Sequence, residues 1–296
     1  MKIVPSALAL AGVFLISTAE AGAPIKLLLI GSGPDGHPVQ THEYMAGLKI
    51  LAKCLKDVPG LEITTVRADE PWRDGPELIA RADGVVLYLS EGARWMNHDP
   101  KRREALAKMA ARGGGISVLH WAMGTKDAKY IDGCVQLLGG CHGGPDRKYK
   151  ILETDAVIAD RNHPISSGIK DFRVRDEFYY RLKFVKAKKG VHSLLRVTID
   201  AQPETVAWCW ERPDHGRSFG FSGLHYHDNW RRIEYRRLVA QGILWTLKKP
   251  IPKDGLPVRV TEDDLKLSGS PLSSEPRKRR RSIYAINRRP CRLPCG

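Results

Sequence analysis

Three histidines stand where side chains of this type could do chemistry. His120 directly follows the apolar run 116–119, and one residue separates His225 from His227. In an extended chain, residues two apart point to the same side, so the sequence predicts that His225 and His227 share a face. Such imidazoles beside a carboxylate could hold a zinc-like divalent metal or act as general acid and base. The alternative is histidines that only make hydrogen bonds or face solvent.

Two acidic residues precede an aromatic run. Asp176 and Glu177 are followed by residues 178–180, which read Phe-Tyr-Tyr. Aromatic faces stack on sugar rings and carboxylates bind sugar hydroxyls, so this segment suits a carbohydrate site. The tryptophans Trp121 and Trp230 would be further stacking platforms beside Tyr179. The alternative is a strand edge that its charged residues keep soluble.

Two glycine-containing motifs fit familiar spacings but lack the matching chemistry. Residues 31–36 have the G-x-G-x-x-G spacing of a dinucleotide site, yet Pro34 removes a backbone donor and the next helix begins only near Thr41. We therefore expect a substrate-lining loop there and no nucleotide cofactor. Residues 216–220 have the G-x-S-x-G spacing of a nucleophile elbow, but they continue as strand and loop instead of turning into a helix. A serine nucleophile is not expected.

The elements that must position these residues alternate between strand and helix in the first half of the chain. Apolar runs predict strands at 25–30, 61–66, 84–89 and 116–119, and helical spacing predicts helices at 41–58 and 99–112. The second half is richer in strands, expected around 150–152 and at 177–184, 193–197, 206–210 and 218–221, before a last helix at 234–248. This order predicts an α/β fold with a mainly parallel central sheet covered by helices on both faces. Ligands of such sheets bind outside the carboxyl ends of the strands, where His120 falls.

The first 21 residues have the pattern of a signal peptide. Lys2, a mostly apolar stretch over 3–17 and the small-x-small triplet 19–21 predict cleavage after Ala21. The alternative is a membrane anchor, but the apolar run is shorter than the roughly 20 residues that a spanning helix needs. We expect an exported protein, periplasmic or secreted, with no membrane span after cleavage.

Export would allow the six cysteines to form disulfides. Cys134 and Cys141 are close enough in sequence for a local bridge, and buried free thiols are the alternative. None of the cysteines has the paired C-x-x-C spacing of a structural zinc site.

The net charge of +15 on 296 residues is unevenly spread. Residues 273–296 hold eight basic residues and one acid, and the excess on the rest of the chain is mild. We therefore expect no nucleic-acid partner, and residues 251–296 are expected to form a basic, disordered extension. The 42% hydrophobic and 27% charged residues are typical of globular proteins and exclude collagen-like, coiled-coil and fully disordered chains.

Eight segments together resemble the ThuA-like family, which is linked to trehalose utilisation. They are residues 113–120 (GGGISVLH), 139–142, 162–164, 172–179, 206–208, 216–218, 223–225 and 242–245. The resemblance implies that residues 22–250 form a flavodoxin-like three-layer α/β/α sandwich, similar to class I glutamine amidotransferases. It also implies a role in the metabolism of disaccharides, including oxidised (3-keto) sugars. Glutamine amidotransferase activity is not expected, because His120 lies near the place of the cysteine nucleophile and no G-x-C-x-G occurs.

By position, the resemblance implies His120, Glu177 and His225 as site residues, with His142 and His163 secondary. His37, His42 and His227 lie outside the matched motifs. Together with the stacking argument, this gives a substrate-binding set of Trp121, His142, His163 and Tyr179.

Our first hypothesis is an exported sugar-processing enzyme that acts on a small-molecule sugar. His120 and His225 would be acid–base groups, or would bind a divalent metal together with His227, and Glu177 would be their carboxylate partner. Proton abstraction next to a sugar carbonyl, or an elimination or hydrolysis built on it, would suit these groups. The alternative is a non-catalytic carbohydrate-binding protein, in which the aromatic residues govern affinity and the histidines do not.

Overall fold

The computed structural model describes residues 22–267, and the predicted signal peptide at 1–21 and the basic tail at 273–296 lie outside them. The compact unit described below extends to Leu265. Among the described residues, no helix is both long enough and apolar enough to cross a membrane.

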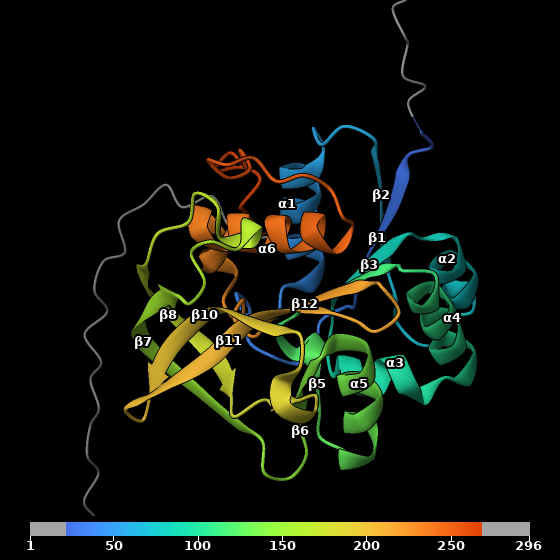
Figure 1. The fold of residues 1–296 in the computed structure, drawn as a ribbon, viewed down its shortest axis with the longest axis horizontal. Coiled ribbons are helices and arrows are strands. Elements are labelled where there is room, and N and C mark those ends of the chain that lie inside the picture. Colours follow the sequence, from blue (N-terminus) through green and yellow to red (C-terminus); the bar gives the residue numbers. More distant parts are fainter. Residues whose placement is uncertain (1–21, 268–296) are drawn as a thin grey trace, which may run out of the picture. The chain divides into compact units, whose positions relative to one another are not determined.

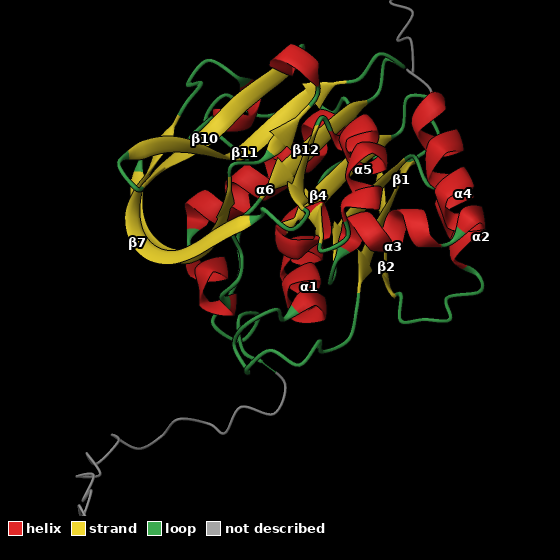
Figure 2. Ribbon diagram, turned by 90° about the horizontal axis from the view of Figure 1, so that it is seen from below, coloured by secondary structure: helices red, strands yellow, loops and turns green. Residues whose placement is uncertain are grey.

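A nine-stranded sheet forms the centre of this unit (Figures 1 and 2). Five strands, in the order β2-β1-β3-β4-β12, run parallel to one another. This is the 2-1-3-4-5 order of flavodoxin-like folds. The bounds of these strands are Leu61–Arg67 (β2), Ile25–Gly31 (β1), Gly84–Tyr88 (β3), Gly115–Leu119 (β4) and Arg217–Phe221 (β12).

The sheet continues beyond β12 with antiparallel strands in the order β11-β10-β7-β8. Their bounds are Gln202–Glu211 (β11), Val191–Ile199 (β10), Lys148–Ile158 (β7) and Phe172–Tyr180 (β8). The parallel arrangement that the sequence predicts thus holds for the first half of the sheet. The later strands follow one another without a crossover helix, so they pair antiparallel. Three short strands, β5 (Gly124–Thr125), β6 (Gly140–Gly143) and β9 (Lys183–Phe184), form a small separate sheet.

Helices cover both faces of the parallel strands, so the predicted α/β/α sandwich is confirmed. Alternate residues of β1 belong to two separate cores, with Leu27 and Leu29 in one and Leu28 and Ile30 in the other. The first core contains α1 (Tyr44–Leu55) and α6 (Ile233–Thr246). The second contains α2 (Gly75–Arg81), α3 (Gly92–His98), α4 (Pro100–Ala111) and α5 (Ile131–Leu138). Both faces of β1 are therefore buried, which is why it reads as a continuous apolar run.

Helix α4 begins and ends where the sequence predicts. The side chain of Asp99 accepts hydrogen bonds from the backbone N–H groups of Lys101 and Arg102, and Pro100 occupies the first helical position. After the last turn, Gly113 adopts a φ of +85°, which a residue with a side chain rarely adopts. The chain then enters β4, which leads directly to His120.

One expected boundary needs correction, and the structure decides between the two alternatives for the cysteines. Residues 251–265 belong to the compact unit and not to an extension, since Leu256, Val258 and Leu265 are buried. Gln241 of α6 also accepts a hydrogen bond from the backbone of Leu256 at 2.7 Å. The cysteines among residues 22–267 are free and buried, so the local bridge between Cys134 and Cys141 is not formed.

Candidate functional site

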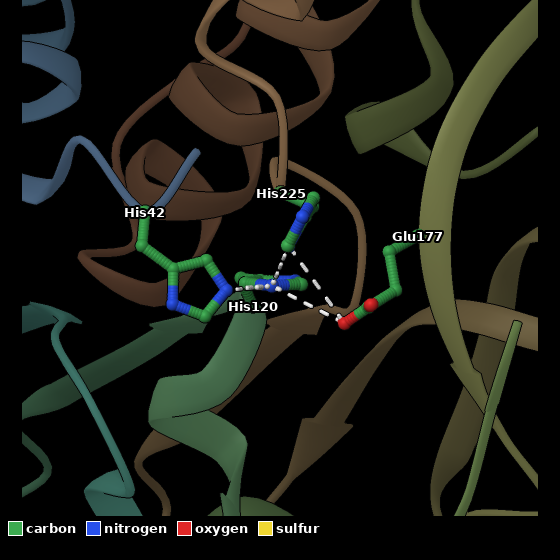
Figure 3. A group of neighbouring side chains, drawn as sticks. All are labelled: His42, His120, Glu177 and His225. Carbon is green, nitrogen blue, oxygen red and sulfur yellow. Dashed lines mark hydrogen bonds and ion pairs between the residues drawn. The ribbon is translucent and has the colours of Figure 1, made fainter. Parts of the chain in front are cut away.

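Three histidines and one glutamate converge at the carboxyl ends of the parallel strands (Figure 3). His42 lies in the loop after β1, His120 directly follows β4, and His225 follows β12. Glu177 comes from β8 in the antiparallel half of the sheet. The strand order reverses at β1, and such a switch point is where open α/β sheets bind ligands.

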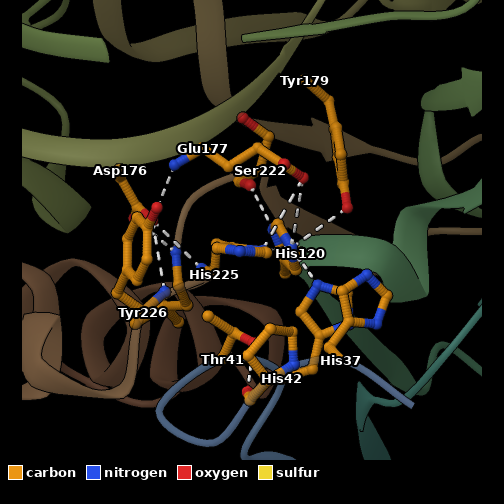
Figure 4. A network of polar contacts seen from close by, with 12 residues as sticks. His37, Thr41, His42, His120, Asp176, Glu177, Tyr179, Ser222, His225 and Tyr226 are labelled. Atoms are coloured by element: carbon orange, nitrogen blue, oxygen red, sulfur yellow. Dashed lines mark hydrogen bonds and ion pairs between the residues drawn. The ribbon is translucent and has the colours of Figure 1, made fainter. Parts of the chain in front are cut away.

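His120 is fully buried, and the hydrogen bond of one ring nitrogen fixes the role of the other. Its Nδ1 donates to the backbone carbonyl of Ser222 at 2.8 Å, which leaves the Nε2 lone pair directed into the group (Figure 4). This Nε2 lies 3.0 Å from Nε2 of His42, 3.3 Å from Nδ1 of His225 and 3.0 Å from the Tyr179 hydroxyl. Burial, and then the neighbouring histidines, hold the pKa of His120 well below its usual value. Its ring is therefore neutral at physiological pH.

His42 is oriented in a similar way by Asp35. Its Nδ1 donates to the Asp35 carboxylate at 2.8 Å, so its Nε2 also presents a lone pair to the group. The same carboxylate accepts hydrogen bonds from the Tyr44 hydroxyl at 2.7 Å and from Nδ1 of His37 at 2.7 Å. Burial alone would raise the pKa of Asp35, but the hydrogen bonds from His42 and Tyr44 outweigh it and hold that pKa well below its usual range. Asp35 therefore stays ionised.

The two Nε2 atoms face each other as lone pairs, because both rings donate their Nδ1 hydrogens elsewhere. A proton could bridge one pair of nitrogens, but the nitrogen of His225 converges on the same point. All the ligand atoms of His42, His120, Glu177 and His225 lie within 4.8 Å of one another. In a tetrahedral zinc site with Zn–N bonds of about 2.0–2.1 Å, neighbouring nitrogens are separated by about 3.3 Å. The distances from Nε2 of His120 to the nitrogens of His42 and His225, 3.0 Å and 3.3 Å, are close to that value.

Glu177 is buried beside the histidines. One of its carboxylate oxygens lies 3.8 Å from Nε2 of His120 and 3.8 Å from Nδ1 of His225. Burial, followed by the charge of Asp176, raises the pKa of Glu177 to about 7. A carboxyl group with this pKa can take up or release a proton near neutral pH.

Asp176 holds the backbone that carries His225. Its carboxylate accepts hydrogen bonds from the backbone N–H groups of Leu224 at 2.7 Å and His225 at 3.2 Å, and from the Tyr235 hydroxyl at 3.0 Å. Burial raises the pKa of Asp176 to about 6, and these hydrogen bonds partly offset that rise. Asp176 is therefore a positioning residue for the loop after β12.

Aromatic side chains form one wall of a cleft of about 410 Å³ above the histidines. His142 stacks on Tyr179 with ring centroids 4.2 Å apart, and Trp121 packs against both. Burial, then the charge of Arg147, lowers the pKa of His142 to about 3. The structure thus brings Trp121, His142 and Tyr179 to the site, next to His120, Glu177 and His225.

Three of the residues that the sequence singled out lie elsewhere. His227 begins a 3₁₀ turn, so it does not share a face with His225, and its Nε2 donates to the carbonyl of Leu265 at 3.0 Å. His163 accepts a hydrogen bond from the backbone of Ile165 at 3.2 Å and does not line the cleft. Trp230 is fully buried in the core and is not available for stacking on a sugar.

His42 and Asp35 are the main site residues that the sequence reasoning missed. Residues 31–36 were expected to be a substrate-lining loop, and Asp35 and His37 do line the cleft. His42 has a positive φ of 54° and follows Thr41, which pairs with Tyr226. This tertiary pairing turns His42 toward the site, and no local pattern in the sequence signals it.

The fold agrees with the comparisons to known proteins. Residues 31–246 match the ThuA family, described as trehalose utilisation, and the chain therefore belongs to that family. It is similar to the crystal structure of a ThuA-like protein from Parabacteroides merdae, with 17% identity and a TM-score of 0.58 over 83% of this chain and 100% of that chain. A ThuA-like protein from Bacteroides uniformis matches with 15% identity and a TM-score of 0.57, over 80% of this chain and 97% of that chain.

At these identities the likeness concerns the fold alone. A glutamine amidotransferase from Thermotoga maritima also matches, with 12% identity and a TM-score of 0.40 over 76% of this chain and 96% of that chain. No curated protein sequence matches the chain.

Proposed function

We propose that this protein is an exported enzyme of sugar metabolism that binds a divalent, zinc-like metal ion through His42, His120 and His225. One observation carries the proposal: the Nε2 lone pairs of His42 and His120 face each other at 3.0 Å, while their other nitrogens are committed to Asp35 and Ser222. The Tyr179 hydroxyl can donate a hydrogen bond to Nε2 of His120, but that bond leaves the nitrogens of His42 and His225 without a shared partner, whereas one cation can bind all three. Carboxylate and carbonyl partners of this kind orient metal-binding histidines in proteins.

A bound metal of this type would polarise a carbonyl oxygen of the substrate or activate a water molecule. Glu177 lies beside the histidines and would carry the proton that leaves or joins the substrate. The Tyr179 hydroxyl, 3.0 Å from Nε2 of His120, would donate a hydrogen bond to a substrate oxygen. Proton abstraction next to a sugar carbonyl, or an elimination or hydrolysis that follows from it, fits these roles.

The class of substrate is proposed from the family and from the lining of the cleft. Membership of the ThuA family suggests a role in trehalose utilisation. The wall made by Trp121, His142 and Tyr179 offers apolar ring faces together with polar edges, which is a suitable surface for a sugar ring. Oxidised disaccharides carry the carbonyl group that the proposed chemistry needs.

The experiment is a measurement of metal content on the full chain after incubation with Zn²⁺ and removal of the excess. We expect about one metal ion per chain in the parent and none in the double variant His120→Ala, His225→Ala. The matched control, His163→Ala with His227→Ala, removes two histidines outside the group and should keep the metal. Circular dichroism would verify that each variant folds.

Absence of metal from the parent would contradict the metal site. A panel of trehalose and its 3-keto form would then test the chemistry. Turnover by the parent and not by Glu177→Gln would support acid–base catalysis. Affinity without turnover would support the alternative, a non-catalytic carbohydrate-binding protein.

Export is proposed from the sequence of residues 1–21. Its test is expression of the full chain in a bacterium, followed by fractionation and N-terminal sequencing. We expect the protein outside the cytoplasm with Gly22 as its first residue. A cytoplasmic protein that retains Met1 would contradict this proposal.

A further inference from the structure

Strand β7 forms one side of the cleft, whereas His42 and His225 reach the cleft from the loops after parallel strands. Tyr149 and Ile151 of β7 line the cleft, and they pair directly with Tyr179 and Glu177 of β8. Tyr149 is 59% exposed and Ile151 is 44% exposed, which is unusual for large apolar residues. An exposed aromatic ring at the mouth of a polar cleft is a suitable platform for a sugar ring.

Two cations, Lys126 and Arg147, line the same cleft. Among residues 22–267, neither lies within ion-pair distance of a carboxylate, whereas their neighbours Lys129 and Lys183 pair with Asp127 and Asp146. The guanidinium of Arg147 donates to the carbonyl of Gly144 at 3.1 Å, which holds the side chain in place. The backbone N–H of Lys126 donates to the Glu91 carboxylate at 2.7 Å. These contacts anchor both residues and leave most of their side-chain donors unused.

His142 supplies an independent sign of a polar ligand. It is only 1% exposed, and both of its ring nitrogens are buried without a hydrogen-bond partner among the residues that the structure describes. Buried polar atoms in native proteins are almost always paired, so an unpaired imidazole that lines a cleft indicates a partner supplied by a ligand. A sugar hydroxyl, which both donates and accepts, would satisfy either nitrogen.

With the proposed metal bound, the charges of the cleft favour an anion. Lys126 and Arg147 are balanced within it only by Asp35 and Glu177. The Asp35 carboxylate is already occupied by hydrogen bonds from His37, His42 and Tyr44. A divalent cation on the histidines would make the cleft net positive even with both carboxylates ionised. Charge-assisted hydrogen bonds from Arg and Lys to a carboxylate or phosphate are about twice as strong as neutral ones.

We propose that the cleft binds a sugar that carries a negatively charged group, with its ring on Tyr149, a hydroxyl on His142 and its charged group between Lys126 and Arg147. The inference rests on the proposed function in two respects, namely that the site takes a sugar and that the histidines hold a divalent cation. It narrows the substrate class from neutral disaccharides to acidic sugars. The charged group is a carboxylate or a phosphate, and the experiment separates the two.

The test is isothermal titration calorimetry on the full, zinc-treated chain with four probes: D-glucuronate, glucose 6-phosphate, D-glucose and trehalose. We expect at least one anionic probe to bind about tenfold or more tightly than both neutral sugars. The double variant Lys126→Met, Arg147→Met should lose that preference. Lys150→Met is the matched control, because Lys150 lies on β7 close to Arg147 in sequence but pairs with Asp200 at 2.6 Å outside the cleft.

Each outcome decides the proposal. Preference for glucuronate identifies a carboxylate, and preference for glucose 6-phosphate identifies a phosphate. Neutral sugars that bind as tightly as both anions, a preference that survives in the double variant, or no binding by either anion would overturn the inference. The metal content of the same samples tests the proposed metal site separately, so failure of one claim is not mistaken for failure of the other.

Discussion

Nε2 of His42 and Nε2 of His120 lie 3.0 Å apart, although 78 residues separate them in the sequence. Each ring donates its Nδ1 hydrogen to an oxygen, from Asp35 in one case and from the Ser222 backbone in the other. The two lone pairs are thus fixed toward each other by hydrogen bonds on the opposite side of each ring. Lone pairs at this distance repel each other, and a bound cation would remove that repulsion. The proposed metal site is therefore already arranged before a cation binds.

Substitution of Asp35 tests whether the carboxylate orients His42. We expect Asp35→Asn to weaken zinc binding by about 10- to 100-fold while all three histidines remain, because the amide no longer fixes His42 with its Nε2 lone pair free. Competition with a chromophoric chelator would measure the affinity. Asp228→Asn, at an exposed carboxylate that pairs with Arg231, is the control and should leave the affinity unchanged. Equal affinities in Asp35→Asn and the parent would contradict the orienting role.

His142 gives a prediction about pH and stability. Its pKa falls from 6.5 to about 3 on folding. As the pH drops below 6.5, the His142 imidazole therefore becomes protonated in the unfolded chain but stays neutral in the folded chain. The free energy of unfolding of the parent falls as a result. The variant His142→Phe keeps the stacked ring and should lose less stability than the parent when both proteins are measured without metal. Urea unfolding at pH 7.5 and pH 5 should give a difference between the two proteins that changes by about 2 kcal/mol in favour of the variant at pH 5. A difference that does not depend on pH would argue against a buried neutral imidazole.

Asp176 is expected to be important for stability and for the position of His225. Asp176→Ala leaves the backbone donors of Leu224 and His225 and the Tyr235 hydroxyl without their acceptor. We expect the free energy of unfolding to fall by about 3 kcal/mol, and by only about 1 kcal/mol in Tyr235→Phe, which removes a single hydrogen bond. Chemical denaturation would measure both. Similar losses in the two variants would show that Asp176 does not organise this loop.

Gly92 marks a close contact behind the site. A Cβ at this first residue of α3 would lie 2.1 Å from the backbone oxygen of Ala122, in the 3₁₀ turn that begins with His120. We expect Gly92→Ala to destabilise the protein by about 2 kcal/mol and to lower its zinc content, since the turn must move. Gly133→Ala is the control, because its Cβ would meet only the end of the flexible Asn97 side chain. Thermal unfolding and metal analysis would check both, and equal behaviour of the two variants would refute the prediction.

The sequence predicts the parallel half of the fold well, because β1, β3 and β4 are buried on both faces and read as apolar runs. His120 follows from this directly, since it comes immediately after β4. The full length of β7 cannot be predicted from its residues, because it depends on pairing with β8 along nine residue pairs and not on an apolar pattern in β7 itself. Tyr149 was missed for that reason.

The direction of the histidines is harder to predict than their position. His225 and His227 share a face only if the chain stays extended, and the 3₁₀ turn from His227 to Arg231 breaks that condition. His42 depends on positive φ angles at Gln40 and His42 and on the pairing of Thr41 with Tyr226. The turn changes the local backbone and the pairing is a tertiary contact, and the spacing of residues in the sequence signals neither.

The three histidines come from the ends of parallel strands, whereas Tyr149 and Ile151 lie on β7 in the antiparallel half. On the proposed function, changes on β7 would therefore alter which sugar is accepted while the proposed metal ligands stay untouched. During evolution, reactivity and choice of substrate would be free to diverge on this scaffold. Two relatives with identical histidines need not act on the same compound. A shared family name would then indicate common ancestry and not a common substrate.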